Sequence, residues 1–409
     1  MTALADRTSQ RPAERAQALK SPPRTLLLSW GAPPVKTGSS VIVGNLARQF
    51  HSEEMLVASE LPHGEHPSGF GESGPRLAYI ARGWPPSWRG ARWWRRAQLP
   101  LMIARAIYLC RRYRCSNVIA VFPNEEFLIV GYVVSVLTGS RFFMYMHNTW
   151  LENRQGIALR MAQALQPRMF KRAKHVFLMS EGMAELYRAH YPGLRCSPLV
   201  HSINEEVPAF EPPPTPGSPL RLTISGNIYE VCRDATERFC VALSRVADTE
   251  LTLLTATPHS YLAGLGLLRD NVHCASAAPD EVVETLRKAD ILVLPHGFTG
   301  TYSAVEYQTI FPTRTIEYLI SGRPILAHAP RDCYLTRFLK ENDCALVVDN
   351  PSIEQLIDAI QSLRENEGLR AKLVRNALIA AERFQGPKVA RFLRERVAEN
   401  NNGTSGKWA

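Results

Sequence analysis

The residues best suited to chemistry fall in one stretch at positions 311–327, FPTRTIEYLISGRPILA. Its pattern predicts a helix that opens after a proline, stops at a glycine and leads into a buried strand. In the first turn of such a helix, the backbone N–H groups of Thr313, Arg314 and Thr315 have no partner within the helix. They lie at the positive end of the helix dipole, beside a cation and two hydroxyls. This combination predicts a binding site for a diphosphate.

A carboxylate lies on the same face of this predicted helix. Glu317 follows Thr313 by four residues, so both side chains could point into one cleft. We expect Glu317 to accept hydrogen bonds from ribose hydroxyls, which together with the diphosphate site would bind a nucleoside diphosphate. An ordinary capped helix, with Arg314 and Glu317 as a solvated pair, has the same spacing. Spacing alone leaves that alternative open.

A second candidate loop follows the strand expected at 222–225. Gly226 and Asn227 come directly after this strand, and a helix is expected to begin near Arg233. Glycine permits close approach of the backbone to a ligand, and Arg233 could meet a phosphate. A tight turn followed by a surface arginine would give the same pattern.

A third candidate loop is WGAPPVKTGSSV at positions 30–41. Gly38 and Ser39 stand at the entrance of an apolar helix, where backbone N–H groups can face an anion. The loop is neither the GxGxxG dinucleotide fingerprint nor a P-loop ending in GK(S/T). A dehydrogenase or an NTPase is therefore disfavoured.

A histidine marks a fourth position. His147 ends the strand expected at 141–147, where it could hydrogen-bond a sugar hydroxyl or stabilise developing charge. A structural histidine that caps a loop is the alternative. His201 and Asn204, near the end of the last strand of this half, carry no comparable signal.

Two series of short apolar runs, separated by helical stretches, predict an α/β protein with two Rossmann-like domains. The segment 208–219 is too rich in proline for a helix or a central strand and is expected to be a semi-rigid linker. Loops after the strands of two such domains meet at a central cleft. Strands are expected at 25–29, 77–80, 117–122, 141–147, 175–179 and 198–203, and then at 222–225, 251–256, 272–274, 291–294, 325–329 and 345–348.

The segment at 312–325 resembles the P-(S/T)-(K/R)-x-x-E-Y-x-x-x-G-(R/K)-P-(I/V) signature of the family-4-type retaining glycosyltransferases of bacterial polysaccharide and glycolipid synthesis. The resemblance implies the GT-B fold, in which two Rossmann-like domains face a central cleft. It also implies that Thr313, Arg314 and Glu317 hold the phosphates and ribose of a nucleotide-sugar donor. By the same resemblance, the loop at Gly226 approaches the donor diphosphate, and the loop at Gly38 reaches across the cleft to the donor phosphates or to the acceptor. A histidine at the place of His147 is implied to contact the donor sugar.

One position departs from the family pattern. Many members carry a second glutamate eight residues before the one matched by Glu317, and this chain has Thr309 there. The nearest carboxylate is Glu306, which becomes the candidate for steadying the transferred sugar.

The expected organisation is a disordered lead (1–23), an acceptor domain (24–207), the linker (208–219), a donor domain (220–385), and a terminal helix with a disordered tail (386–409). With 45% hydrophobic residues among 409, the chain can build such cores. Eight cysteines without zinc-ligand spacing indicate a reducing cytosol and no metal site. No signal peptide and no apolar run of membrane-spanning length are apparent. We expect a cytoplasmic protein.

A basic, tryptophan-rich cluster at 82–113 and a formal net charge of +10 suggest contact with an anionic membrane surface. A solvated basic face with tryptophans packed inward is the alternative. Nucleic-acid binding is disfavoured, because no recognised nucleic-acid module accompanies the cluster.

The resulting hypothesis is a glycosyltransferase that needs no metal. Arg314, Arg233 and helix-terminal amides would neutralise the leaving nucleotide, while a glycan or lipid-linked acceptor enters near Gly38 and His147. The resemblance implies retention of anomeric configuration. Two alternatives remain open: a nucleotide-sugar epimerase of the same fold, and a non-catalytic relative that binds a sugar or a partner.

Overall fold

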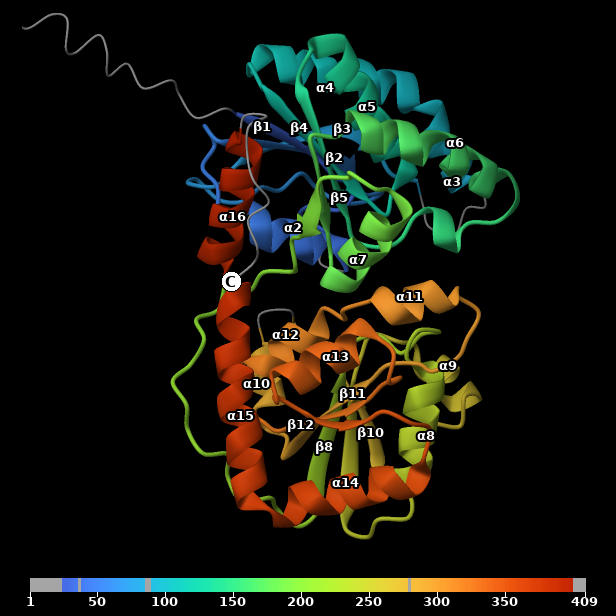
Figure 1. The fold of residues 1–409 in the computed structure, drawn as a ribbon, viewed down its shortest axis with the longest axis vertical. Coiled ribbons are helices and arrows are strands. Elements are labelled where there is room, and N and C mark those ends of the chain that lie inside the picture. Colours follow the sequence, from blue (N-terminus) through green and yellow to red (C-terminus); the bar gives the residue numbers. More distant parts are fainter. Residues whose placement is uncertain (1–23, 36–37, 85–89, 279–280, 400–409) are drawn as a thin grey trace, which may run out of the picture.

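The computed structural model describes residues 24–35, 38–84, 90–278 and 281–399. Two β-sheets with helices on both faces form two domains, stacked along the long axis of the molecule (Figure 1). We call them the first and the second domain, in chain order. The predicted α/β architecture of two Rossmann-like domains is confirmed.

The first domain is built on a seven-stranded sheet in the order β3-β2-β1-β4-β5-β6-β7, with every pair of neighbours parallel. Such a doubly wound order brings the loops that follow the strands to one edge. Its strands are β1 (Thr25–Leu28), β2 (Met55–Leu61), β3 (Arg76–Arg82), β4 (Asn117–Phe122), β5 (Arg141–Met146), β6 (His175–Leu178) and β7 (Cys196–Pro198). Its helices are α2 (Ser39–Ala47), α3 (Ala91–Ala97), α4 (Leu99–Arg112), α5 (Glu125–Thr138), α6 (Gly156–Arg172) and α7 (Glu181–His190), with a 3-10 turn, η1 (Leu151–Asn153).

The second domain is built on a six-stranded parallel sheet in the order β10-β9-β8-β11-β12-β13. Its strands are β8 (Leu220–Ser225), β9 (Thr249–Leu254), β10 (Val272–Ala275), β11 (Ile291–Pro295), β12 (Ile325–His328) and β13 (Leu346–Val348). Its helices are α8 (Arg233–Leu243), α9 (His259–Gly264), α10 (Val282–Leu286), α11 (Ala304–Thr309), α12 (Arg314–Leu319), α13 (Tyr334–Glu341), α14 (Ile353–Glu365) and α15 (Glu367–Ala381), followed by the 3-10 turn η2 (Glu382–Phe384).

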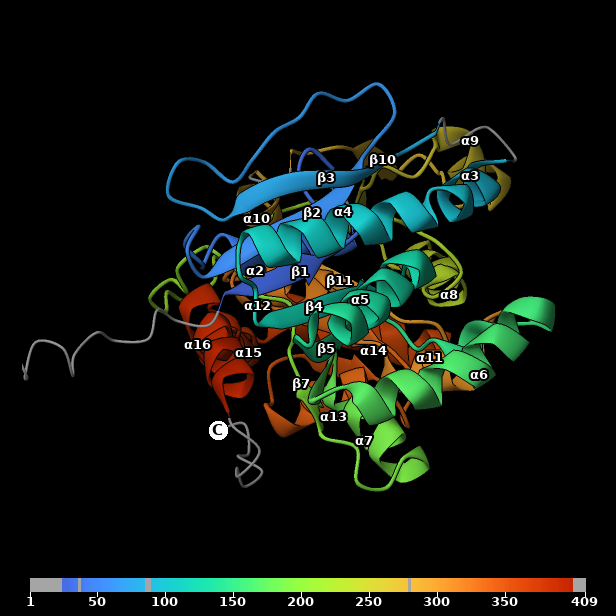
Figure 2. The same ribbon diagram turned by 90° about the horizontal axis from the view of Figure 1, so that it is seen from above.

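Each sheet is buried between two layers of helices. In the first domain, α4 and α5 cover one face, whereas α2 packs on the other. In the second, α8 and α14 cover one face, and α12, α13 and α15 cover the other (Figures 1 and 2). Burial on both faces explains the nearly continuous apolar strands seen in the sequence.

The strand predictions hold with two exceptions, and the other strands occur within two residues of the expected ends. The strand β2 was missed. The strand expected at 198–203 was placed wrongly, because sheet pairing ends at Pro198 and the chain then leaves toward the second domain. Ile203 pairs instead with Gln385, at the end of the second domain.

The chain crosses between the domains at two adjacent places. At this double crossing, the Ile203 amide donates to the Phe384 carbonyl at 2.9 Å, and the Gly386 amide donates to the Ile203 carbonyl at 2.8 Å. The terminal helix α16 (Gly386–Ala398) then packs on the first domain, where Arg394 pairs with Glu54 at 2.8 Å. The last helix of the chain therefore belongs to the core of the first domain.

Three general features bear on the sequence expectations. All eight cysteines lie in the described residues and are free thiols. None of the helices within the described ranges is long and apolar enough to cross a membrane. Over the same ranges, no group of three or more His, Cys, Asp or Glu side chains is arranged to hold a metal ion.

A glycine contact between α5 and the sheet gives a test of this packing. A Cβ on Gly131 would lie 2.6 Å from Cβ of Ala120 on β4, too close for two carbon atoms. We expect Gly131→Ala to destabilise the protein by about 1–3 kcal/mol, seen as a thermal midpoint lowered by several degrees. Gly264→Ala is the control, since a Cβ there meets nothing within 4 Å. Equal midpoints for the two variants would contradict this account of the packing.

Candidate active site

The centre of the candidate site is a contact between Arg314 and the loop that follows β8. Gly226 has φ +86°, and a Cβ there would lie 3.1 Å from Cζ of Arg314. The Arg314 Nη2 donates to the Asn227 carbonyl at 2.9 Å. Its Nη1 is buried and has no hydrogen-bond partner. The guanidinium therefore lies against a loop without a side chain in the way, and it keeps one donor nitrogen unused.

The position of α12 is set by Tyr318, which is fully buried. Its hydroxyl accepts from the Ser225 amide at 2.7 Å and donates to the Val293 carbonyl at 3.2 Å. These two contacts tie α12 to the end of β8 and the middle of β11. The helix stops before Gly322, whose φ of +71° is the left-handed conformation expected after a helix. The sequence signature thus encodes an anchor, Tyr318, as well as possible ligand contacts.

The two threonines that flank Arg314 differ in their surroundings. Thr313 is exposed, whereas Thr315 is fully buried with its hydroxyl unpartnered. The Thr315 amide donates to the Pro312 carbonyl at 3.0 Å, so the expectation of a free backbone donor there is wrong. The first turn closes with this hydrogen bond, which spans three residues instead of four. Only the backbone amides of Thr313 and Arg314 precede Thr315 in this turn.

Glu317 lies on the same helix, and the pKa of its carboxyl group is raised. Desolvation raises the pKa of Glu317 to about 7, against the effect of Arg314 and together with the negative charge of Glu205. Glu205 lies just beyond the first domain crossing. A carboxyl group with such a pKa changes its charge near neutrality, which makes hydrogen bonding to a ligand at this position sensitive to pH.

Arg233, expected to meet phosphate, is held elsewhere. It begins α8 as predicted, but its guanidinium lies 3.3 Å from Glu230 and 3.7 Å from Glu237. Two carboxylates on adjacent turns compensate this cation, and an approaching phosphate would have to compete with both. Arg233 is therefore a weaker candidate than its place in the sequence indicated, and Arg314 is the stronger one.

His147 follows β5 and is nearly buried, with 7% of its surface exposed. Burial lowers the pKa of His147 to about 3, and the neighbouring His201 adds to this effect. Burial also lowers the pKa of His201 to about 4. Neither ring nitrogen of His147 has a hydrogen-bond partner. A neutral imidazole with both nitrogens unused is suited to hydrogen bonding with a ligand hydroxyl. His201, which neighbours His147, becomes a stronger candidate than the sequence indicated.

Gly38 and Ser39 stand at the start of α2, as predicted. Gly38 has φ +48° and is exposed, and a Cβ there would meet nothing within 4 Å. Figures 1 and 2 place α2 on the side of the first domain that faces α12. The loop thus lies on the correct side of the molecule for contact with a ligand shared by both domains.

Glu306 lies on α11 and connects the two domains. It is 4% exposed. Its Oε1 accepts from Asn148 Nδ2 at 3.1 Å, and its Oε2 accepts from both Thr149 Oγ1 and Asn153 Nδ2 at 2.5 Å. With both oxygens engaged by the first domain, the geometry favours a positioning role over the sugar-steadying role expected from the sequence.

Thr309, which occupies the place of the family's second glutamate, does not face outward. Its hydroxyl donates to the Val305 carbonyl of its own helix at 2.8 Å. Its carbonyl accepts from Ser180 Oγ of the first domain at 2.5 Å. This position therefore contributes to the contact between domains.

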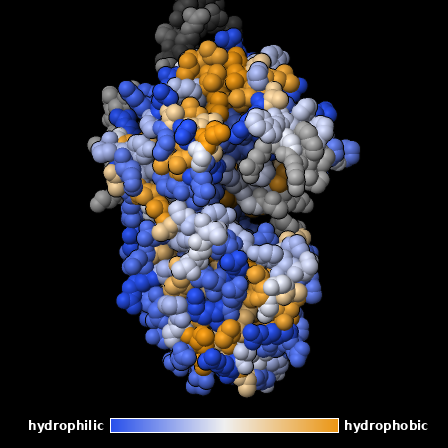
Figure 3. Space-filling view, turned by 90° about the vertical axis from the view of Figure 1, so that its right-hand side faces the viewer, coloured by the Kyte–Doolittle hydropathy of each residue, from blue (hydrophilic) through white to orange (hydrophobic). Residues whose placement is uncertain are grey.

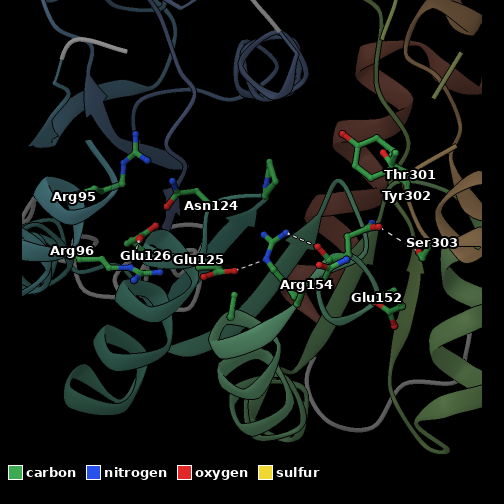
Figure 4. Close-up of a pocket in the computed structure, with 14 residues that line it drawn as sticks. Arg95, Arg96, Asn124, Glu125, Glu126, Glu152, Arg154, Thr301, Tyr302 and Ser303 are labelled. Carbon is green, nitrogen blue, oxygen red and sulfur yellow. Dashed lines mark hydrogen bonds and ion pairs between the residues drawn. The ribbon is translucent and has the colours of Figure 1, made fainter. Parts of the chain in front are cut away.

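A pocket of about 860 Å³ opens between the domains, next to these contacts (Figure 4). Residues 301–303 of the second domain form one wall, and the other walls come from the first domain. The Thr301 amide donates to Glu230 Oε1 at 2.8 Å, which ties this wall to the loop that carries Gly226. The first domain contributes Arg95, Arg96, Pro123, Asn124, Glu125, Glu126, Glu152, Asn153, Arg154, Gln155 and Ala158.

Sequence reasoning missed this pocket almost entirely. Its walls come from separate stretches between positions 95 and 303, and Arg95 and Arg96 were interpreted only as part of the basic cluster at 82–113. The one available signal was Asn124, directly after β4, whose side chain caps α5 by accepting from the Phe127 amide at 3.3 Å. Polar residues after a central strand of a parallel sheet are candidates for ligand binding.

The second half of the chain matches a known family. Residues 259–379 match the family described as "Glycosyl transferases group 1". A search among curated proteins found no match to the chain.

Solved structures of similar fold extend over nearly the whole chain. Sucrose-phosphate synthase from Thermosynechococcus elongatus aligns with a TM-score of 0.69 at 15% identity, covering 91% of this chain and 97% of that one. The Anabaena protein HepE, solved with UDP and glucose, aligns at 0.63 and 15% identity over 92% of this chain and 100% of its own. An α,α-trehalose-phosphate synthase (UDP-forming) from Burkholderia xenovorans, solved with glucose-6-phosphate, aligns at 0.60 and 12% identity over 91% and 100%.

These matches bear on the choice between the alternatives. At such low identity, the structural matches establish the fold, which is the expected GT-B arrangement. The family match concerns the half that contains Arg314 and Glu317. It favours sugar transfer over the epimerase and the non-catalytic alternatives. The chain is a glycosyltransferase of the GT-B fold, with a glycosyltransferase group 1 domain in its second half.

Proposed function

We propose that the protein transfers a sugar from a nucleoside-diphosphate sugar to a glycan or lipid-linked acceptor, with retention of configuration and without a metal ion. The observation that carries the proposal is the Arg314 guanidinium, which lies against Gly226 with its buried Nη1 unpartnered. A buried donor without a partner is costly, and a ligand that accepts its hydrogen bond removes that cost. A diphosphate is such a ligand.

The donor would lie along the second domain. Its diphosphate would contact Arg314 and the Gly226–Asn227 backbone, with Thr313 at the edge, and its ribose would contact Glu317. UDP is the first nucleotide to test, because HepE was solved with UDP and the Burkholderia synthase is described as UDP-forming.

The chemistry would rest on stabilising the leaving nucleotide. As the sugar–phosphate bond breaks, negative charge grows on the diphosphate, and a preorganised guanidinium stabilises that charge where water is excluded. Arg314 would supply this positive charge. His147, which is neutral, would bind a hydroxyl of the transferred sugar and would not act as an acid. Retention of configuration is part of the proposal through the family resemblance.

The acceptor would enter through the pocket between the domains. The pocket adjoins the segment after His147, since Asn153 both lines it and donates to Glu306. It is also tied to the donor loop through Glu230. An acceptor in this pocket would contact residues 301–303 of the second domain.

A membrane surface is the second proposed partner. On α4, Leu101 is 47% exposed and Tyr108 is 63% exposed, and Leu137 of the adjacent α5 is 55% exposed. Exposed arginines, including Arg111 and Arg112, lie on the same helix. Figure 3 shows apolar residues gathered at the top of the first domain, the end that carries α4 and α5 in Figure 1. Apolar and basic groups together suit an anionic lipid surface.

The donor site is tested by removing Arg314. We expect Arg314→Ala to weaken UDP binding roughly 10–100-fold, because a charge-assisted hydrogen bond contributes about 1.5–3 kcal/mol. Arg233→Ala is the matched control and should change the affinity less than about threefold. Isothermal titration calorimetry measures both, with circular dichroism to confirm folding. Unchanged UDP affinity in folded Arg314→Ala would refute the assigned site.

The acidity of Glu317 predicts a pH effect on UDP binding. Only the ionised carboxylate accepts hydrogen bonds from both ribose hydroxyls, and with a pKa of about 7 it is protonated below neutrality. Wild-type affinity should fall up to about tenfold from pH 8 to pH 6. Glu317→Gln should bind more weakly at pH 8 and lose this part of the pH dependence. Titration of the UDP phosphate affects both proteins equally, so parallel profiles would contradict the prediction.

The Glu317 carboxyl group affects the free energy of unfolding with the opposite dependence on pH. The pKa of Glu317 is raised in the folded protein, so its contribution to stability is complete below about pH 4.5 and is lost as pH rises through about 7. Wild type should therefore lose stability relative to Glu317→Gln between pH 6 and pH 8. Thermal unfolding without ligand measures this difference.

Membrane contact is tested by liposome flotation. Wild type should float with vesicles that contain anionic lipid and not with neutral vesicles. Tyr108→Asp should abolish flotation, because a carboxylate opposes insertion beside anionic headgroups. Ile379→Asp is the control, since Ile379 is equally exposed, at 63%, but lies on α15 of the second domain. Equal flotation with neutral vesicles, or none with either kind, would rule out this partner.

A further inference from the structure

The charges that line the pocket between the domains are already paired. Arg154 Nε lies 2.6 Å from Glu125 Oε1. Arg96 Nε lies 3.6 Å from Glu126 Oε1. Figure 4 shows Arg154 directed at Glu125 and Arg96 beside Glu126. Both arginines therefore already have a carboxylate partner within the protein, which a ligand would have to share or displace.

The third arginine of the lining is held most firmly. Arg95 donates to both oxygens of Glu60, at 2.6 and 2.9 Å. Glu60 lies behind the pocket wall, on β2, and is 6% exposed. Such a two-point contact fixes the guanidinium in its plane. Arg95 therefore compensates a buried carboxylate.

The balance of charge is slightly negative. The described lining holds three guanidiniums, and with Glu60 behind it the same region holds four carboxylates, the fourth being Glu152. Glu152 accepts from the Tyr187 hydroxyl at 3.3 Å. One carboxylate is thus in excess among the described residues.

An anionic ligand would meet resistance here. The side chains of Glu60, Glu125 and Glu126 are only 8%, 11% and 13% exposed. A phosphate that took a guanidinium would leave such a carboxylate unpaired in a poorly hydrated place. The pocket therefore disfavours phosphorylated or carboxylated groups.

An uncharged sugar can bind without breaking these ion pairs. Each hydroxyl both donates and accepts, and an arginine–carboxylate pair offers a donor N–H beside an acceptor oxygen without losing its own contact. The amides of Asn124 and Gln155 add further polar groups. Tyr302, 44% exposed, provides an aromatic edge. At about 860 Å³, the pocket lies within the range of roughly 300–1,000 Å³ that is typical of ligand sites.

We propose that this pocket selects an acceptor whose terminal unit is an uncharged, polyhydroxylated sugar, read by paired arginines and carboxylates. This inference rests on the proposed function and names the acceptor class of the same site. It distinguishes an uncharged glycan end from a sugar phosphate or a uronic acid.

The test measures binding to the protein saturated with UDP. The probes are the methyl glycosides of glucose, galactose, mannose and N-acetylglucosamine, together with glucose-6-phosphate and glucuronate, followed by saturation-transfer NMR. At least one neutral glycoside should bind, and each anionic probe should bind at least fivefold more weakly. Glu126→Gln, which releases Arg96 from its partner, should raise the affinity for glucose-6-phosphate at least fivefold.

Two further variants keep the result interpretable. Glu284→Gln, on α10, releases the surface Arg287 that follows this helix, since Arg287 pairs with Glu284 at 2.5 Å, and should change nothing. Arg96→Gln removes the donor of this pair, so it should weaken binding of the neutral glycoside and bind glucose-6-phosphate no better than wild type. If Glu126→Gln does not fold, this second variant and the wild-type comparison decide the question.

The outcomes separate the two proposals. Wild type that binds glucose-6-phosphate more tightly than every neutral probe would overturn the acceptor class. So would the absence of binding by all neutral probes while UDP still binds. Failure of UDP itself to bind would count against the proposed donor site.

Discussion

One buried carboxylate holds the two halves of the site in register. Glu306 of the second domain accepts hydrogen bonds from three side chains of the first, and it would be a strongly unfavourable buried charge without them. Asn153, one of its donors, also accepts from Ser303 Oγ at 3.3 Å and lines the pocket. The position of the donor loop relative to the pocket wall therefore depends on Glu306. Both carboxylate oxygens of this residue already accept hydrogen bonds within the protein.

Features governed by local chemistry could be predicted from the sequence. Gly322 has the left-handed conformation expected after a helix, and α8 begins at Arg233. Gly226 permits the close approach that its position after a strand indicated, although what approaches it in the structure is Arg314. The two sheets followed from apolar runs of strand length, because buried parallel strands are apolar on both faces.

Features that depend on distant partners could not be predicted in this way. The strand β2 was missed because Ser59 and Glu60 interrupt its apolar run, and both are buried in the structure. The buried charge of Glu60 is compensated there by Arg95, which lies on α3, far along the chain. The pairing of Arg233 was different: its two carboxylate partners lie three and four residues away, and helical spacing alone would have indicated it.

The double crossing at Ile203 and Phe384–Gly386 has a mechanical consequence. Both connections between the domains run side by side, along with α15 and α16, at one flank of the molecule, whereas α3, α6 and α11 lie at the opposite flank (Figure 1). If one domain rotated against the other about this flank, groups near the axis would move little, and the pocket walls contributed by α3 and residues 301–303 would move most. Small angular changes at the backbone would therefore widen the mouth of the pocket while the loops close to the axis stay nearly in place.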